Sequence, residues 1–310
     1  MIQEPMDILT QYPVRKSKKQ KQAFRADVCS YASSLGYQCR EETGSFGVRN
    51  LVIGDPAKAK VLLTAHYDTC AALPFPNLIT PCNFLPFLGC QLLQIFALLT
   101  ASILLGILVG ILTASVDIGY WCGYLGFWVF LVLMLIGPAN KTNANDNTSG
   151  VVTLLEIART LPENQREKTC FILFDLEEAG LLGSAAYQKA HKDETTHQLV
   201  LNLDCVGDGD HIRLFPTKRL KKDPGRLEFL RRICGYHGKK SIQLRESGFA
   251  VYPSDQRAFP YGVGICALRN SKAGLYLGRI HTKRDTILEQ TNVNLLRAAL
   301  TTFLCQEGKP

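Results

Sequence analysis

The most restrictive feature of this 310-residue sequence is a 72-residue stretch, 69–140, in which Asp117 is the only charged residue. Within it, 84–115 and 118–139 are uncharged runs of 32 and 22 residues. Because a helix of about 20 apolar residues crosses a bilayer core, each run is long enough for one span. The rest of the chain is polar and carries all the other charges. The pattern predicts a polar globular protein with an apolar insert.

The net charge of +8 limits the choice of partners. Lys and Arg concentrate in 14–25 and 218–233, and basic runs on helices are usually solvated faces. Neither run is interleaved with aromatic residues that could stack on bases, so we expect no nucleic acid partner. Beside a membrane insert, lipid headgroups are the better functional interpretation of these runs.

The cysteines and the N-terminus bear on the compartment. Eleven cysteines are present, without a C-x-x-C pair, and Cys170 and Cys205 lie in apolar, strand-like runs. A buried free thiol behaves as a small hydrophobic group, so we expect no disulfide framework and a reducing compartment. The N-terminus lacks the apolar core of a signal peptide.

Outside the insert, apolar strand patterns alternate with amphipathic helix patterns. Strands are predicted at 37–42, 49–55, 60–66, 169–176, 198–204 and 262–268, and helices at 20–36, 149–161, 183–192, 223–238 and 292–304. This alternation is typical of a sheet covered on both faces. We therefore expect the α/β class, as a three-layer α/β/α sandwich with a mostly parallel mixed sheet.

Polar residues follow three of these strands, where α/β sheets collect their functional groups. They are His66 and Asp68, then Glu177 and Glu178, then Asp204; loops add Asp146, and His281 with Asp285. Each one alone is also explained as a solvated turn, a strand-end histidine or an N-cap. Together they are the mixed nitrogen and oxygen donors that zinc accepts, and five ligands with one shared carboxylate suffice for two ions. Asp68 and Asp285 would then orient the imidazoles.

The motifs HYD, NDNTSG, EEAGLLGS, NLD and IHTKRD, in this order, resemble the co-catalytic zinc aminopeptidase family, peptidase family M28. Its relatives include glutamate carboxypeptidases and glutaminyl cyclases. The resemblance covers about 60–69 and 143–286, and implies the zinc peptidase fold with two zinc ions per chain. It implies that Asp146 bridges the ions, that Glu178 and His281 complete one site, and that His66 and Asp204 complete the other. Glu177 would be the general base, with Asp68 as the other catalytic residue.

Two departures from the family pattern stand out. Members commonly join the HYD and NDN segments by a short loop, whereas here about 77 residues lie between Asp68 and Asp146. A histidine common in an S-D-H motif is replaced by Gln256. It is not one of the metal ligands, so we expect activity to survive with an altered specificity pocket.

The long insertion fits a two-helix transmembrane hairpin. Since the ligands before and after it must meet on one side of the membrane, it must cross an even number of times. We expect a discontinuous peptidase domain, 1–70 and 140–310, and an inserted hairpin, 71–139, with spans at about 88–114 and 118–138. Its two Gly-x3-Gly pairs, at 106 and 110 and at 119 and 123, allow close contact within the hairpin or in a homodimer. A soluble hydrophobic hairpin in a large core and a segment that re-enters the membrane without crossing it are the alternatives.

The tip of the hairpin, 115–123, has no Lys or Arg, whereas the catalytic side is basic. We therefore expect an integral membrane protein with two spans, and by the positive-inside bias we expect its catalytic domain to face the cytoplasm. We expect a metal-dependent aminopeptidase acting on peptides, among them hydrophobic or membrane-delivered ones. A glutaminyl cyclase or N-acyl amidohydrolase on the same fold, and a catalytically silent membrane scaffold or sensor, remain alternatives.

Overall fold

The computed structural model describes residues 1–306 except 74 and 76, so the last four residues of the expected peptidase domain lie outside it. The strands are β1 Cys39–Thr43, β2 Arg49–Ile53, β3 Val61–His66, β4 Thr169–Phe174, β5 Leu199–Leu203, β6 His211–Pro216, β7 Gly235–His237, β8 Lys240–Leu244, β9 Gly262–Ser271 and β10 Gly274–Tyr276. The helices of eight or more residues are α2 Lys18–Ser34, α3 Phe84–Thr113, α4 Val116–Ile136, α5 Gly150–Thr160, α7 Leu182–Ala190, α9 Pro224–Arg231 and α10 Gln290–Gln306. Short helices are α1 Ile8–Gln11, α6 Glu163–Arg166 and α8 Lys192–Thr195.

The strands form one mixed sheet in the order β1-β2-β4-β3-β5-β9-β6-β8-β7, with β10 paired to β9. The central strands β4, β3, β5 and β9 are mutually parallel, and antiparallel pairs flank them. The carboxyl ends of these four strands therefore meet at one edge of the sheet. The predicted α/β fold with a mixed sheet is confirmed, and the centre of the sheet is parallel.

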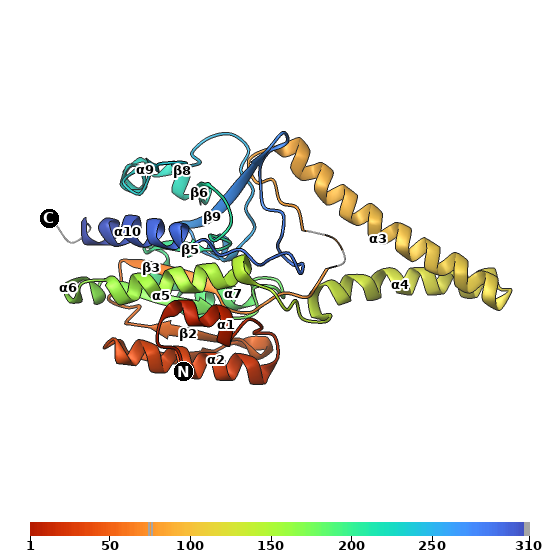
Figure 1. Ribbon diagram of the computed structural model, residues 1–310, viewed down its shortest axis with the longest axis horizontal. Helices are drawn as coiled ribbons and strands as arrows, with labels where there is room; N and C mark the ends of the chain where they lie inside the picture. The colour runs from red at the N-terminus through yellow and green to blue at the C-terminus, as the bar shows by residue number, and fades with distance from the viewer. Residues whose placement is uncertain (74, 76, 307–310) are drawn as a thin grey trace.

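The sheet is covered on both faces because its central strands are apolar on both sides. In β3, Leu63 belongs to a core that also contains residues of α2, α5, α9 and α10, whereas Leu62 belongs to a second core with Tyr187 of α7. Successive strand residues point to opposite faces, so a continuous apolar run serves two layers. The helix layer over the first face is visible in Figure 1.

Two local expectations are corrected. The helix predicted at 223–238 ends at Arg231, and Gly235–His237 is instead strand β7, which pairs with β8 in an antiparallel turn closed by Gly238 at φ 62°. Cys29 and Cys39 form a disulfide, because the chain turns back after α2 and brings their Cα atoms to 5.3 Å. The other nine cysteines are free, including the buried Cys170 and Cys205.

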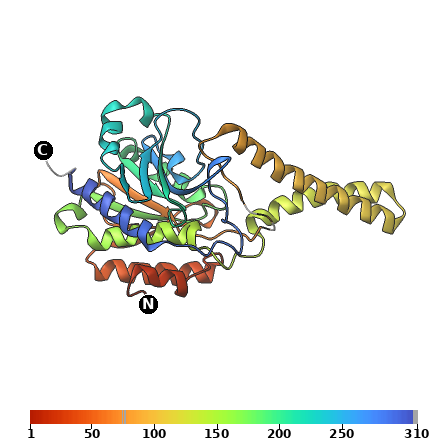
Figure 2. The same cartoon turned by 45° about the horizontal axis from the view of Figure 1, so that its top comes forward.

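Helices α3 and α4 form a hairpin that projects from the body of the protein (Figures 1 and 2). Both are long and apolar enough to cross a membrane, and only 11% of the most apolar window of each is buried. Most of their side chains therefore do not pack against the described body of the protein. Pro86 is accommodated in the first turn of α3, where its missing N–H has no helical partner to lose. The chain reverses at Ala114, which has left-handed backbone at φ 51°.

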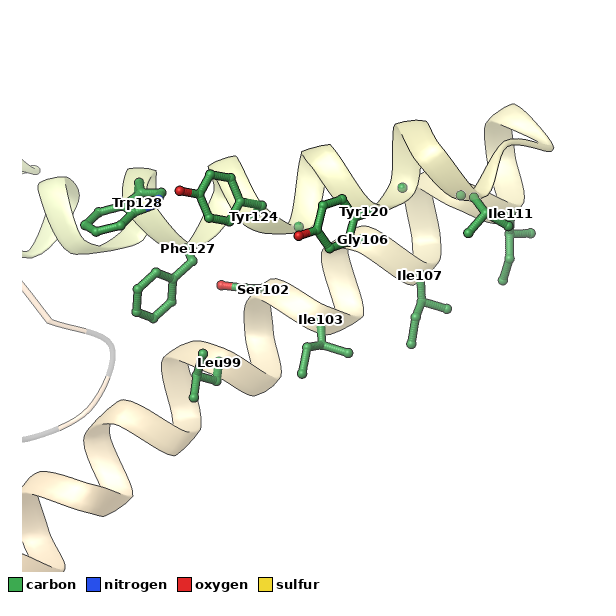
Figure 3. Close-up of a pocket in the computed structure, with 14 residues that line it drawn as sticks. Leu99, Ser102, Ile103, Gly106, Ile107, Ile111, Tyr120, Tyr124, Phe127 and Trp128 are labelled. Carbon is green, nitrogen blue, oxygen red and sulfur yellow. The ribbon is translucent and has the colours of Figure 1, made fainter.

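The glycine pairs are used between the two arms of the hairpin. A Cβ on Gly119 would lie 2.6 Å from the carbonyl oxygen of Gly106, and one on Gly123 would lie 3.0 Å from that of Ser102. Beside this contact the arms leave an apolar groove of about 780 Å³, lined by Ile103 and Ile107 of α3 and Tyr120, Tyr124 and Trp128 of α4 (Figure 3). Because the glycines already serve contact within the hairpin, they give no separate support for a homodimer.

Gly119→Ala is expected to weaken the hairpin by about 1–3 kcal/mol, since the added methyl group forces two backbones apart. Gly89→Ala, also in a hairpin helix, is the matched control, because a Cβ there meets nothing within 4 Å. The measurement is loss of helical circular dichroism during sodium dodecyl sulfate titration of the protein in mild detergent. Equal midpoints for the two variants would contradict this packing.

Candidate functional site

The candidate site lies at the carboxyl edge of the central parallel strands. His66 is the last residue of β3 and lies opposite Phe174, the last residue of β4. Asp204 follows β5 directly, and Glu177 and Glu178 follow β4 after a short turn. The sheet register therefore brings together side chains from three separate strand ends.

Asp146 lies between the two histidines. It belongs to the segment Ala144–Ser149, which leads into α5 and contains a cis peptide bond between Asp146 and Asn147. One carboxylate oxygen, Oδ1, is 3.3 Å from Nε2 of His66, and the other, Oδ2, is 3.1 Å from Nε2 of His281. A single carboxylate thus has one oxygen directed to each histidine.

Each histidine has a further carboxylate beside it. Oδ1 of Asp204 is 3.5 Å from Nε2 of His66, and Oε2 of Glu178 is 3.5 Å from Nε2 of His281. The five predicted ligands therefore form two groups of three that share Asp146. One group is His66, Asp146 and Asp204; the other is His281, Asp146 and Glu178.

This donor set fits zinc. Ligand atoms about 2.1 Å from a tetrahedral ion are roughly 3.4 Å apart, and the nitrogen–oxygen distances here are 3.1–3.5 Å. Oδ1 of Asp204 and Oε1 of Glu178 are buried without a hydrogen-bond partner. A buried carboxylate oxygen without a donor is costly, and a cation would satisfy both oxygens.

The close carboxylates of the site would also be stabilised by a bound cation. Burial raises the pKa of Glu178 to about 8. His281 lowers this pKa, and the nearby carboxylate of Asp146 raises it further. Burial also opposes ionisation of Asp146, but His281 and His66 outweigh it and lower the pKa of Asp146. Bound cations are often the largest local charges in such sites, and one here would relieve the repulsion among the carboxylates.

Glu177 lies beside the ligand groups. One of its carboxylate oxygens is within 4.8 Å of ligand atoms of His66 and Glu178. Burial raises the pKa of Glu177, His66 lowers it, and Glu178 and Asp255 raise it further. A carboxylate with a raised pKa is suited to accept and return a proton near neutral pH.

Asp68 and Asp285 each accept two hydrogen bonds from backbone N–H groups of the candidate site. The two oxygens of Asp68 accept hydrogen bonds from the backbone N–H groups of Glu177 (3.1 Å) and Glu178 (3.2 Å), while Oδ1 is 3.5 Å from Nδ1 of His66. Those of Asp285 accept from the N–H groups of Asn145 and Asp146, at 2.8 and 3.0 Å. Asp285 thus holds the backbone of Asp146, and its predicted role in orienting an imidazole stays a prediction.

Sequence reasoning missed the two asparagines that flank Asp146. Nδ2 of Asn147 donates to the carbonyl oxygen of Leu203 and its Oδ1 accepts from the N–H of Cys205, so it ties Asp146 to the end of β5. Oδ1 of Asn145 accepts from the N–H of Gly207. Both asparagines belong to the NDN motif, which was recognised in the sequence. Their hydrogen-bond partners follow or end strand β5, more than 50 residues away, and could not be read from the motif.

Two further residues near the site were also missed. Cys70 is fully buried, and its Sγ lies within 4.8 Å of ligand atoms of Glu178 and His281. Asp255 is fully buried, both its oxygens lack a hydrogen-bond partner, and burial raises its pKa to about 7. Its neighbour Gln256, noted from the sequence, donates to the carbonyl oxygen of Tyr252 and lies outside the two ligand groups.

Backbone strain is concentrated at this edge of the sheet. Leu176, Cys205 and His281 have φ values of 56°, 56° and 61°, which non-glycine residues adopt at a cost. Each is itself a site residue or adjoins one. Such strain is typical of functional sites, where the surrounding structure holds side chains in a required direction.

The roots of the hairpin are bonded to the loop that carries His281. The N–H of Leu73 donates to the carbonyl oxygen of His281 at 2.8 Å, and Nδ2 of Asn140 donates to that of Thr282 at 3.0 Å. Ala71 and Ala139 pair in an antiparallel bridge between the roots. The insert therefore leaves the domain beside the candidate ligands.

Comparison with known proteins places the chain among peptidases. The profile of peptidase family M28 matches residues 131–304, more than half of the chain. Leucine aminopeptidase 1 of Ajellomyces dermatitidis is 29% identical over 174 residues, which are 51% of this chain and 44% of that protein. Aminopeptidase YwaD of Bacillus subtilis is 43% identical over 67 residues, 21% of this chain and 15% of that protein. The chain thus spans less than half the length of these relatives.

Solved structures share the fold over almost the whole chain. The structure of Porphyromonas gingivalis glutaminyl cyclase matches with a TM-score of 0.64 at 16% identity, over 98% of this chain and 96% of the cyclase chain. The structure of Legionella pneumophila LapA aminopeptidase matches with a TM-score of 0.60 at 14% identity, over 99% of this chain and 70% of the LapA chain. Together with the family match, these likenesses bear out the resemblance seen in the motifs: the chain belongs to peptidase family M28.

Proposed function

We propose that this protein is a membrane-anchored, zinc-dependent aminopeptidase. The observation that carries the proposal is the position of Asp146, whose two oxygens face the two histidines. A carboxylate in that position suits a pair of ions better than a single one. The family match and the aminopeptidase relatives support peptide hydrolysis as the reaction.

In this proposal His66, Asp204 and Asp146 would hold one zinc ion, and His281, Glu178 and Asp146 would hold the other. Bound zinc would supply Lewis-acid polarisation of the scissile carbonyl and lower the pKa of water enough for it to act as a nucleophile at neutral pH. Glu177 accepts the proton released when water attacks the carbonyl carbon, and returns it to the leaving amine nitrogen as the C–N bond breaks. Asp68 fixes the backbone of Glu177 and Glu178 and so positions both carboxylates.

The hairpin is proposed to span the bilayer twice, with 1–70 and 140–310 as the peptidase domain. Its support is the length of the helices and their apolar, outward-facing side chains. With the roots bonded to the His281 loop, the site would open near the bilayer surface. Hydrophobic or membrane-delivered peptides are therefore the proposed substrates.

The domain is proposed to face the cytoplasm, because the hairpin tip lacks Lys and Arg. The Cys29–Cys39 disulfide favours the opposite orientation, because disulfides persist mainly in oxidising compartments. The redox state of this pair in the cell therefore tests the orientation directly.

Glu177→Gln is expected to lower peptide hydrolysis by about 100- to 10,000-fold, the usual contribution of a general base, with metal content unchanged. The measurement combines metal analysis by mass spectrometry with turnover of free aminoacyl peptides, N-blocked peptides and peptides with N-terminal glutamine. Glu167→Gln, the same change at an exposed position, is the matched control.

The wild-type protein is expected to hold two zinc ions and to cleave only free amino termini. Cyclisation of N-terminal glutamine without hydrolysis would instead identify a glutaminyl cyclase. Absence of metal would leave a membrane scaffold and end the catalytic proposal. If soluble aminoacyl substrates are cleaved as well as lipophilic peptides, the proposed membrane-delivered substrate class is wrong.

A further inference from the structure

The N-terminal basic run lies at the root of the hairpin. Nζ of Lys16 donates to the carbonyl oxygen of Leu135 at 3.0 Å, one residue before α4 ends. The start of α2 and the domain end of α4 lie on the same side of the protein in Figures 1 and 2. The end of a membrane span lies at the level of the lipid headgroups. If the hairpin spans the bilayer as proposed, α2 begins at that level.

A polar pocket of about 610 Å³ opens beside the first turns of α2. It is lined by Lys18, Lys21, Gln22, Arg25, Glu41, Phe46, Gly47, Arg49, Asp175 and Leu176. It thus combines side chains of α2, the β1–β2 hairpin and the end of β4. The volume is within the range of ordinary small-ligand sites.

The pocket has an excess of positive charge. Lys21 pairs with Asp175 at 2.7 Å, and Glu41 serves both Arg25 (3.1 Å) and Arg49 (3.3 Å). Three cations therefore share two carboxylates, and the fourth cation of the pocket, Lys18, has no ion pair among the described residues. An anion would compensate the remaining charge.

The rim of the pocket carries an exposed aromatic residue. Phe46 is 85% exposed and occupies a tight turn between β1 and β2 at φ 59°. A large apolar side chain beside basic groups suits the boundary between lipid headgroups and acyl chains, where amphipathic groups gather. Phe46 and the basic side chains of the pocket would therefore both suit a position at the membrane surface.

The second basic run differs from the first in its location and in its ion pairs. Residues 218–233 form the turn before α9 and α9 itself. In Figure 1 they lie on the opposite side of the protein body from the projecting hairpin. Arg231 is already paired with Glu228 and Glu246, and Arg226 with Asp223. Although the sequence makes the two runs look equivalent, the fold leaves only the first near the membrane.

We propose that the pocket binds the phosphate of an anionic phospholipid headgroup and so holds the peptidase domain against the bilayer. This inference rests on the membrane insertion of the hairpin, but not on the catalytic mechanism. Lys18 and Arg49 contact the phosphate, and Phe46 lies against the adjoining acyl chain.

The test uses the full chain in mild detergent and native mass spectrometry with phosphatidylglycerol and phosphatidylcholine of the same acyl chains. The wild-type protein retains phosphatidylglycerol preferentially. Lys18→Gln with Arg49→Gln weakens that binding about 30-fold, or about 2 kcal/mol at 1.4 kcal/mol per factor of ten, because each basic residue near a headgroup contributes about 1 kcal/mol. Phosphatidylcholine binding is unchanged.

Lys218→Gln with Lys222→Gln removes the same charge at two exposed positions of the second run and leaves both lipids bound as in the wild type. All the substituted side chains are exposed, and an unchanged circular dichroism spectrum verifies folding. Equal retention of the two lipids by the wild type overturns the proposal, as does an equal loss in the control variant. Displacement of the lipid by inorganic phosphate at similar concentration, or by an acidic peptide, assigns the pocket to a soluble ligand instead.

Failure of this proposal is distinguishable from failure of membrane insertion. A chain that carbonate extracts from membranes refutes the proposed hairpin topology. A chain that resists extraction but shows no headgroup preference refutes only the lipid site.

Discussion

If the hairpin is the proposed membrane anchor, its excision is expected to leave a soluble protein that still binds metal. The N–H of Ala72 donates to the carbonyl oxygen of Pro138 at 2.8 Å, and Ala71 pairs with Ala139 in antiparallel fashion. Because two-residue Asn-Gly turns close such pairs, 73–137 can be replaced by Asn-Gly. Activity is expected to fall by up to about tenfold, since the bond from Leu73 to His281 is lost.

The measurement is partition between membrane pellet and supernatant after carbonate treatment, with the full chain as control, followed by metal analysis. If the excised variant stays in the pellet, the hairpin is not the anchor. A soluble variant without metal would show that the hairpin roots are required to assemble the ligands. Either result would contradict the proposed division into two structural units.

Asp146→Asn is expected to remove at least one zinc ion and to abolish measurable hydrolysis. The substitution keeps the shape of the side chain but removes the charge between His66 and His281. We expect a loss of metal affinity above the 10- to 100-fold typical of residues that only orient a ligand. Asp210→Asn, the same change at an exposed position, controls for the loss of charge.

Metal analysis and turnover are measured on both variants, with circular dichroism as the folding check. Retention of two ions by Asp146→Asn would refute the shared-ligand arrangement. Loss of activity with both ions retained would give Asp146 a different role, in orienting substrate. If Asp210→Asn had the same effect, net charge and not the site would be responsible.

The central strands could be predicted because they are buried on both faces. An unbroken apolar run such as that of β3 is a local property of the sequence. The strands β6, β7, β8 and β10 were not predicted. β6 mixes buried apolar residues with the partly exposed His211 and Arg213, and β7 and β10 have only three residues each. Their strand conformation depends on pairing with β9 and with one another, which local patterns do not reveal.

The identities of the candidate ligands were readable from the sequence, but their partners were not. His66 and His281 are expected donors from motif order alone, whereas their shared contact with Asp146 depends on how β3 and the 277–285 loop meet. The Asn147 contact with β5, the Cys29–Cys39 pair and the proximity of Cys70 to Glu178 likewise join segments that the sequence shows as unrelated.

The sequence by itself determined the apolar hairpin, the α/β alternation and the ordered motifs, because length, periodicity and residue type are local properties of the chain. Only the tertiary structure decided that one carboxylate faces both histidines, that the glycines join the two arms of the hairpin, and that one basic run lies beside the domain end of α4. Each of these is a distance between residues brought together by sheet register and helix packing, and such distances arise only when the chain is folded.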